Sequence, residues 1–208
     1  MSARSGRGPA LGRGATIDRM AVHVDASLPV RPLTVDDVTA MVDAGILAED
    51  DHVELLDGVL VEMSPQGSQH ARVIARLTML LVPIAAAAGL VVSPQCPLDV
   101  ASAISLPEPD LAVAPDTGWD AYAGGALLVV EVSVTSRAVD LGRKAAIYAA
   151  AGVAEYWVLD LPDRRLVVHR QPAGDRYEDV AVLADADTIT AARLPLTVAV
   201  AELLPPRG

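Results

Sequence analysis

An unbroken apolar run, residues 126–130, leads directly into the carboxylate of Glu131. Such a run, rich in Leu and Val, predicts a β-strand that is covered on both faces. An ionised glutamate at the end of a buried strand is costly unless a cation, a metal ion or solvent stabilises it. The pattern leaves two interpretations open. Glu131 belongs to a binding site, or it lies just past the strand, solvated or paired with Arg137.

A second short strand, residues 110–114, begins with an acidic side chain. Asp110 closes the segment Pro-Glu-Pro-Asp, and a proline is well tolerated at the start of a strand. Strands that follow one another in sequence often pair, and in that case Asp110 and Glu131 converge. Two carboxylates with a lysine nearby suit a Mg²⁺ site that acts on phosphates, because hard cations bind oxygen and the ammonium group offsets phosphate charge.

Helical periodicity follows the Glu131 strand. Residues 138–151 predict a helix that Gly152 ends. Asp140 and Lys144 are four positions apart and therefore share a face of this helix. Either they form an exposed ion pair of little energetic value, or Asp140 positions Lys144 so that it projects across the end of the Glu131 strand.

The remaining pattern predicts an α/β domain. Residues 34–46 predict a helix capped by Thr34 with one apolar face, and residues 68–88 predict a longer core helix. Asp57-Gly58 lies between two short apolar runs and predicts a β-hairpin. Further strands are expected at residues 90–93, 96–100, 155–160, 165–170 and 177–183, and the apolar residues 194–204 are expected to dock on the core.

Glu54 and His70 each admit two interpretations. Glu54 interrupts an apolar strand of the hairpin, where it either supports the site or faces solvent. His70 falls in the first turn of the long helix, where a lone histidine is usually a surface residue or is bonded locally. In the alternative interpretation it faces the cleft and touches phosphate or a metal-bound water.

Composition and charge restrict the partners. The 208 residues allow one domain with a real core, and the single cysteine, Cys96, excludes an internal disulfide. We therefore expect a cytoplasmic protein. The formal net charge of −11 is unusual for a protein that binds nucleic acid, because such proteins normally carry a basic surface.

Two segments, one polar and one uncharged, differ most from the rest of the chain. Residues 1–25 are rich in Gly, Arg and Ser without periodicity, and they predict a disordered basic tail ahead of a single domain at residues 26–208. The uncharged run 77–98 is long enough for a membrane span. Its prolines at positions 83, 94 and 97 favour a buried helix followed by a strand, so no membrane contact is expected.

The spacing of these groups resembles a known family. Pro-Asp, then Glu-Val-Ser about twenty residues later, then D-x-x-x-K-x-x-x-Y-A-x-A-G-V-x-E-Y-W-V-x-D resemble the Uma-two family of restriction-endonuclease-like proteins, part of the PD-(D/E)xK nuclease superfamily. The resemblance covers about residues 33–204, including Glu54-Leu-Leu-Asp-Gly and His70. The positions that match the long motif are Asp140, Lys144, Tyr148, Ala149, Ala151, Gly152, Glu155, Tyr156, Trp157 and Asp160.

The resemblance implies a fold and an activity. The fold is a restriction-endonuclease-like core, a central mixed β-sheet flanked by helices with an N-terminal hairpin added. The activity is that of a metal-dependent endonuclease that hydrolyses DNA with Mg²⁺ or Mn²⁺. Asp110, Glu131 and a main-chain carbonyl near Val132 would hold the ion. Lys144 would orient the attacking water and stabilise charge on the phosphate. Glu54 and His70 would be accessory.

Two departures from the pattern keep alternatives open. The third position of E-x-K is Ser133, so the lysine must come from the following helix, and Val134 stands where relatives often have an acid or serine. One alternative is a catalytically inactive protein of the same fold that acts as a binding or regulatory module. RNA is an alternative substrate. Cutting both strands of DNA needs two sites, so a homodimer is also expected, with Trp157 as candidate interface material if it is not core.

Overall fold

The computed structural model describes residues 29–48 and 50–207. The predicted basic tail, residues 1–25, lies outside the described residues. Chain contacts separate residues 1–30 from a compact unit formed by residues 31–208, and of the first unit only Pro29 and Val30 are described, both exposed. Everything below concerns the second unit.

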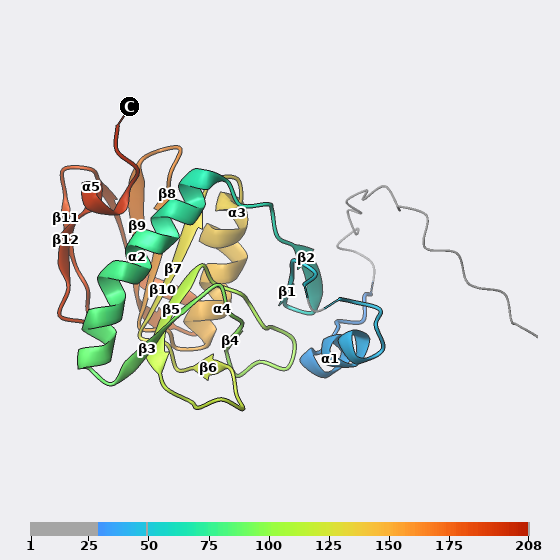
Figure 1. The fold of residues 1–208 in the computed structure, drawn as a ribbon. Coiled ribbons are helices and arrows are strands. Elements are labelled where there is room, and N and C mark those ends of the chain that lie inside the picture. Colours follow the sequence, from blue (N-terminus) through green and yellow to red (C-terminus); the bar gives the residue numbers. More distant parts are fainter. Residues whose placement is uncertain (1–28, 49, 208) are drawn as a thin grey trace, which may run out of the picture. The chain divides into compact units, whose positions relative to one another are not determined.

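A six-stranded mixed sheet organises this unit, in the order β10-β9-β8-β7-β5-β3 (Figure 1). The pair β7·β8 is parallel and the other pairs of the sheet are antiparallel. The strands are β3 (Leu90–Pro94), β5 (Leu111–Pro115), β7 (Leu128–Ser133), β8 (Glu155–Asp160), β9 (Arg165–Ala173) and β10 (Arg176–Ala184).

Helices cover the two faces of the sheet. The long helix α2 (Ser68–Ala87) packs on one face, and the crossover from β7 to β8 packs on the other (Figure 1). A parallel pair needs such a crossover connection, because the chain must return to the starting end of the sheet. The crossover consists of α3 (Arg137–Val139), a π-helix η1 (Asp140–Lys144) and α4 (Ala145–Ala150).

Small elements complete the unit. Helix α1 (Val35–Asp43) begins at Thr34, whose side chain accepts a hydrogen bond from the Asp37 main-chain N–H, while the Asp37 carboxylate accepts from the Thr34 main-chain N–H. The predicted hairpin is present as β1 (Val53–Leu56) and β2 (Val59–Glu62). The other elements are β4 (Leu98–Asp99) paired with β6 (Ala123–Gly124), β11 (Thr188–Thr190) paired with β12 (Thr197–Ala199), and α5 (Val200–Leu203).

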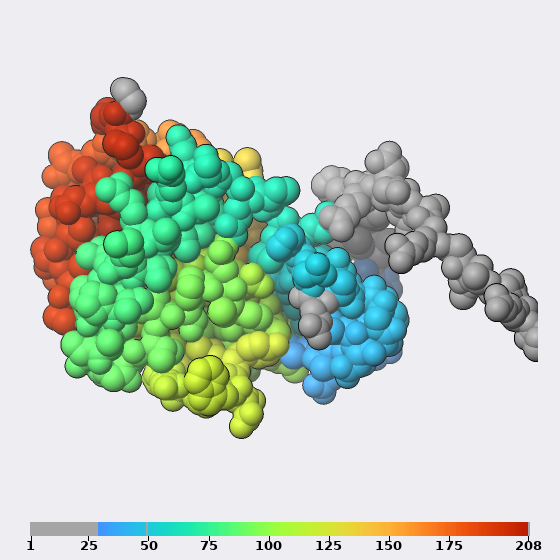
Figure 2. All heavy atoms as spheres, in the orientation of Figure 1, coloured from blue at the N-terminus to red at the C-terminus, as the bar shows by residue number. Residues whose placement is uncertain are grey.

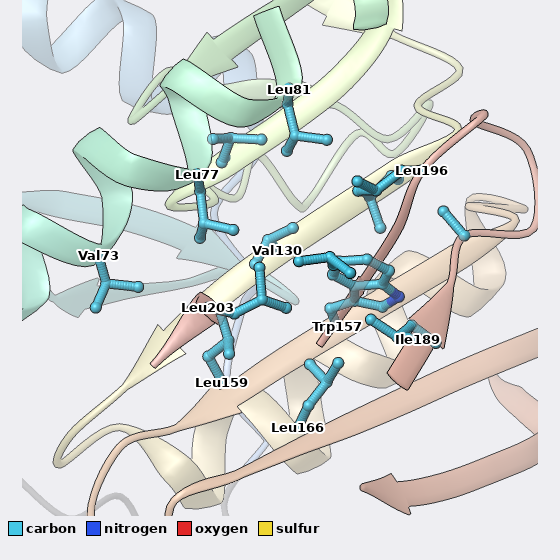
Figure 3. Close-up of a cluster of buried hydrophobic side chains, with 14 of the residues drawn as sticks. Val73, Leu77, Leu81, Val130, Trp157, Leu159, Leu166, Ile189, Leu196 and Leu203 are labelled. Atoms are coloured by element: carbon cyan, nitrogen blue, oxygen red, sulfur yellow. The ribbon is translucent and has the colours of Figure 1, made fainter. Parts of the chain in front are cut away.

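The larger core lies between α2 and the sheet. Figure 3 shows Leu77 and Leu81 of α2 pointing toward Val130 and Trp157, with Leu203 beside them. Trp157 is completely buried, so it is core and not interface material. The C-terminal residues dock on this core, as predicted. Burying one such side chain stabilises the fold by about 1.5–3 kcal/mol.

The outer side of α2 remains open to solvent, and its side chains form part of the surface visible in Figure 2. Met79 is 78% exposed and Val82 is 46% exposed. By length and composition α2 is the one described helix that could span a membrane. Its other side, however, packs in the core through Val73, Leu77 and Leu81, as a helix of a folded domain does.

The predicted fold is confirmed: a mixed sheet flanked by helices with an added hairpin. Three local expectations were wrong. Helix α1 ends at Asp43, before the predicted end at residue 46, and its apolar side chains Val35, Val38, Met41 and Val42 are only half-buried. Strand β7 begins at Leu128 and continues through Glu131 to Ser133. The single helix expected over residues 138–151 is interrupted by the π-helix.

Candidate active site

Asp110 and Glu131 meet because their strands run antiparallel. Leu111 pairs with Val130, which places Asp110, the residue before β5, opposite Glu131 in β7. The main-chain N–H of Asp110 lies 3.4 Å from Glu131 Oε2. The main-chain N–H of Val132 donates to Asp110 Oδ2 at 2.7 Å. The sequence therefore correctly predicted that the two acids converge, and the register explains why.

Glu131 is a buried carboxylate inside the strand, 4% exposed. Its Oε1 accepts hydrogen bonds from Lys144 Nζ and from the Tyr148 hydroxyl, each at 3.0 Å. Burial raises the pKa of Glu131 well above its usual value, the Lys144 charge opposes this rise, and the nearby Asp110 carboxylate adds to it. The alternative interpretation, a solvated side chain paired with Arg137, was wrong.

Lys144 stands between two carboxylates. Its ammonium group lies 2.9 Å from Glu54 Oε2 and 3.0 Å from Glu131 Oε1, and the residue is 5% exposed. Burial alone lowers the pKa of Lys144, but the charges of Glu131 and Glu54 outweigh burial and raise it above its usual value. Lys144 is therefore a fixed cation, not a proton acceptor.

The partners of this lysine decide between the two interpretations of Glu54 and correct the expectation for Asp140. Glu54 does not face solvent: it is 6% exposed, and its Oε2 also accepts a hydrogen bond from the main-chain N–H of Glu108. Asp140 does not pair with Lys144; its carboxylate accepts a hydrogen bond from the Ser136 hydroxyl. The hairpin thus supplies the residue that holds the lysine, a role that sequence analysis had assigned to the neighbouring helix turn.

His70 faces the site from the first turn of α2. Its Nε2 lies 3.1 Å from Asp110 Oδ2, and its side chain is 12% exposed. Burial lowers the pKa of His70, but the hydrogen bond and charge of Asp110 outweigh burial and raise it above the usual 6.5. The interpretation of His70 as a surface residue was wrong.

These groups line one cleft of about 600 Å³. Its walls come from the hairpin, the start of α2, the segment just before β5, the end of β7, and the crossover with the loop that leads into it. Lys144 and His70 are its basic residues. Its acidic residues are Glu54, Glu62, Glu108, Asp110, Glu131 and Asp140.

Sequence analysis missed two members of the site. Glu108 lines the cleft, and burial and the nearby Glu54 charge raise its pKa. Its position two residues before Asp110 on an extended segment could have indicated a shared side, because side chains alternate along such a segment. Tyr148 lies four positions after Lys144 and so on the same face of the helix, and this spacing could have indicated its hydrogen bond to Glu131.

The donor set of the cleft fits a hard divalent cation. Asp110 and Glu131 bring carboxylate oxygen atoms to one wall of the cleft, beside the Val132 main chain, and oxygen ligands are what Mg²⁺ and Mn²⁺ prefer. Within residues 29–48 and 50–207, no group of three or more His, Cys, Asp or Glu side chains is arranged to hold a metal. Main-chain and water oxygens would have to complete the coordination.

The π-helix lies at the centre of the crossover, with Asp140 at its start and Lys144 at its end. Short π-helical turns occur frequently at functional sites. Both residues are buried, and Tyr156 of β8 donates a hydrogen bond to the Asp140 main-chain carbonyl at 2.9 Å. The turn is thereby tied to the sheet beneath it, and Lys144 is directed at Glu131.

This sheet, its crossover and the acidic cleft define a protein with the restriction-endonuclease-like fold. The chain belongs to the Uma2 family, whose description is "Putative restriction endonuclease" and whose match covers residues 39–201. The match includes Asp110, Glu131 and Lys144.

A solved structure has the same fold. It is described as "a putative nuclease belonging to DUF820 from Anabaena variabilis ATCC 29413" and matches with a TM-score of 0.64 and 13% sequence identity. The match covers 83% of this chain and 97% of that chain. No curated protein sequence matches the chain.

Proposed function

We propose that the protein is a metal-dependent endonuclease that hydrolyses phosphodiester bonds of DNA. The observation that carries the proposal is the convergence of Asp110, Glu131 and Lys144 in one cleft, in a chain that belongs to a family of this description. Hydrolysis forms a bond between water oxygen and phosphorus, breaks the bond to the leaving sugar oxygen, and leaves a proton on that oxygen.

Asp110, Glu131 and the main-chain carbonyl of Val132 would hold Mg²⁺ or Mn²⁺. When bound, such an ion activates water and stabilises negative charge on the phosphate. Lys144 contributes a fixed positive charge beside Glu131 and orients the attacking water, and Glu54 keeps its ammonium group in place. His70 orients the Asp110 carboxylate through its Nε2. We place the activity in the cytoplasm and expect a homodimer where both DNA strands are cut.

The test is cleavage of supercoiled plasmid, single-stranded and branched DNA with Mg²⁺ or Mn²⁺. The wild type should cleave at least one of them, a chelator should stop cleavage, and Asp110→Asn should lower the rate by at least about 100-fold, as expected for a metal ligand. Arg72→Gln is a matched control, because Arg72 lies on α2 two residues after His70 but is exposed. A wild type that cleaves none of these DNAs with either ion contradicts the proposal.

The acidity of the cleft favours one second candidate, an inactive protein of this fold that acts as a regulatory or binding module. Phosphate entering the cleft meets the carboxylates described above with only Lys144 and His70 as cations. Metal titration separates the two candidates. Binding of Mn²⁺ that Asp110→Asn abolishes, without cleavage of DNA or RNA, supports the second.

A further inference from the structure

Tyr148 directs its hydroxyl at the buried carboxylate of Glu131. The residue lies in α4, is 0% exposed, and donates to Glu131 Oε1 at 3.0 Å. Lys144, one helical turn earlier, donates to the same oxygen at 3.0 Å. Two buried donors on one carboxylate oxygen fix the orientation of the whole carboxylate, because its other oxygen must then point away from the helix.

The tyrosine ring is itself held in place. Its centroid lies 4.9 Å from that of Tyr156, which belongs to β8, and the two rings are tilted by 55°. Tyr156 is fully buried and bonded to the Asp140 main-chain carbonyl, so it cannot move without disturbing the π-helix. Tyr148 therefore has little freedom to direct its hydroxyl anywhere else.

The second oxygen of Glu131 has a different environment. Oε2 lies toward Asp110, with the Asp110 main-chain N–H 3.4 Å away, at the long limit of a hydrogen bond. This side of the carboxylate faces the cleft, where the Asp110 carboxylate offers further oxygen atoms and is itself held by the Val132 main-chain N–H. A carboxylate that turned freely would lose this orientation.

We propose that Tyr148 is a positioning residue that holds Glu131 so that Oε2 is presented to a divalent cation. This inference rests on the proposed function, since it concerns the same ion. Burial and the neighbouring Glu131 charge raise the pKa of Tyr148 well above its usual value, which favours the neutral phenol that donates this hydrogen bond.

Tyr148→Phe removes the hydroxyl and keeps the ring. Tyr177→Phe is the matched control, because Tyr177 belongs to the same aromatic cluster and donates at 3.0 Å to the Val153 main-chain carbonyl, away from the cleft. Mn²⁺ titration followed by electron paramagnetic resonance should give about tenfold weaker binding for Tyr148→Phe, the effect typical of removing a partner of a metal ligand. Tyr177→Phe should bind as the wild type does. Equal affinity in Tyr148→Phe and wild type, or equal losses in both variants, would overturn the inference.

A metal-free readout separates this inference from the proposed function. Crystal structures of both variants, grown without divalent ions, should show Glu131 in more than one orientation only in Tyr148→Phe. If Glu131 keeps one orientation in Tyr148→Phe, the same as in the wild type, the positioning role is contradicted, even if the protein cleaves DNA. A wild type that binds no Mn²⁺ would contradict the proposed ion, while the orientation of Glu131 would still decide whether Tyr148 positions it.

Discussion

At the scale of single residues, the site depends on how charge is balanced around Lys144. One ammonium group serves two buried carboxylates, those of Glu54 and Glu131. Removing one member of such a cluster is costly, because it leaves uncompensated charge in a medium that solvates it poorly. The same cluster explains why the lysine remains charged and why Glu131 holds a fixed place.

Lys144→Met should therefore reduce stability as well as activity. We expect a loss of about 3–5 kcal/mol in the free energy of unfolding, measured by urea denaturation, because two carboxylates lose their shared cation. In the double variant Lys144→Met with Glu54→Gln, the loss should be smaller than the sum of the two single losses by about 1–3 kcal/mol. If the two single losses simply add up in the double variant, Glu54 and Lys144 have no coupling free energy.

The buried His169 should make the free energy of unfolding depend on pH. It is buried between the rings of Tyr156 and Tyr177, and burial lowers its pKa below the usual 6.5. The unfolded chain then binds more protons than the folded one below pH 6.5, so this residue's contribution is present above 6.5 and is lost as the pH falls. His70, with a raised pKa, contributes with the opposite sign.

To isolate the contribution of His169, the free energy of unfolding is compared between the wild type and His169→Phe. The free energy of unfolding of the wild type minus that of His169→Phe should decrease as the pH is lowered from 7 toward the acid side, because only the wild type must protonate a buried ring. A difference that is flat with pH, or that grows on acidification, would show that the His169 pKa is not lowered.

At the scale of elements, the hairpin β1–β2 matters because it brings Glu54 to Lys144. Its turn fits closely against the preceding segment: Gly58 has a φ of +77°, and a Cβ built on it would collide with the Pro32 Cβ. Only glycine satisfies both the backbone conformation and the space. A change here should therefore displace the element that holds the lysine.

Gly58→Ala should be clearly more destabilising than Gly45→Ala. Gly45 has a similar φ of +68° but no atom within 4 Å of its would-be Cβ, so its substitution tests backbone strain alone. We expect about 1–2 kcal/mol for Gly45→Ala, and a larger loss of unfolding free energy for Gly58→Ala with reduced DNA cleavage. Similar losses for the two variants would mean that the Pro32 contact adds nothing.

The sequence predicts those helices and turns whose position depends on nearby residues alone. The Thr34 cap, the Asp57-Gly58 turn and the long helix of residues 68–88 follow from local chemistry and the periodicity of apolar positions, and they occur close to where they were expected. The π-helix was not predictable, because its five residues carry an ordinary helical pattern and it depends on contacts such as that of Tyr156 with Asp140. The choice between the two interpretations of Glu54 could not be made from sequence for a related reason. Its partner, Lys144, is ninety positions away in sequence, and only the tertiary fold brings the two together.

At the scale of the whole molecule, the net negative charge opposes the binding of nucleic acid. The chain carries a formal net charge of −11. Much of the positive charge on the described surface is already matched by nearby acids. Examples are the pairs Arg137–Asp163, Arg143–Asp57, Arg164–Asp185 and Arg170–Glu155. In the part of the chain that the structure describes, many cationic side chains are thus already paired, so we expect a bound divalent ion to supply part of the attraction.

DNA binding should consequently depend on the ion and only weakly on salt. Fluorescence anisotropy with labelled DNA, in Ca²⁺ to prevent cleavage, compares the wild type with the Asp110→Asn variant. A chelator should remove binding by the wild type, whereas the variant should bind weakly whether or not the chelator is present. The slope of log K against log salt should be about −1 to −3, because few phosphates are neutralised. A steep slope near about −10, with binding that persists in chelator, would reveal a basic surface that the described residues do not provide.

The central claim is that Asp110 and Glu131 share one divalent cation beside Lys144. A crystal structure of the wild type grown with Mn²⁺, with anomalous data collected near the manganese edge, tests it most directly. The account predicts an anomalous peak within bonding distance, about 2.0–2.3 Å, of both carboxylates and of a main-chain oxygen at Val132. An empty cleft at saturating Mn²⁺, or a peak bound by other residues, would contradict it.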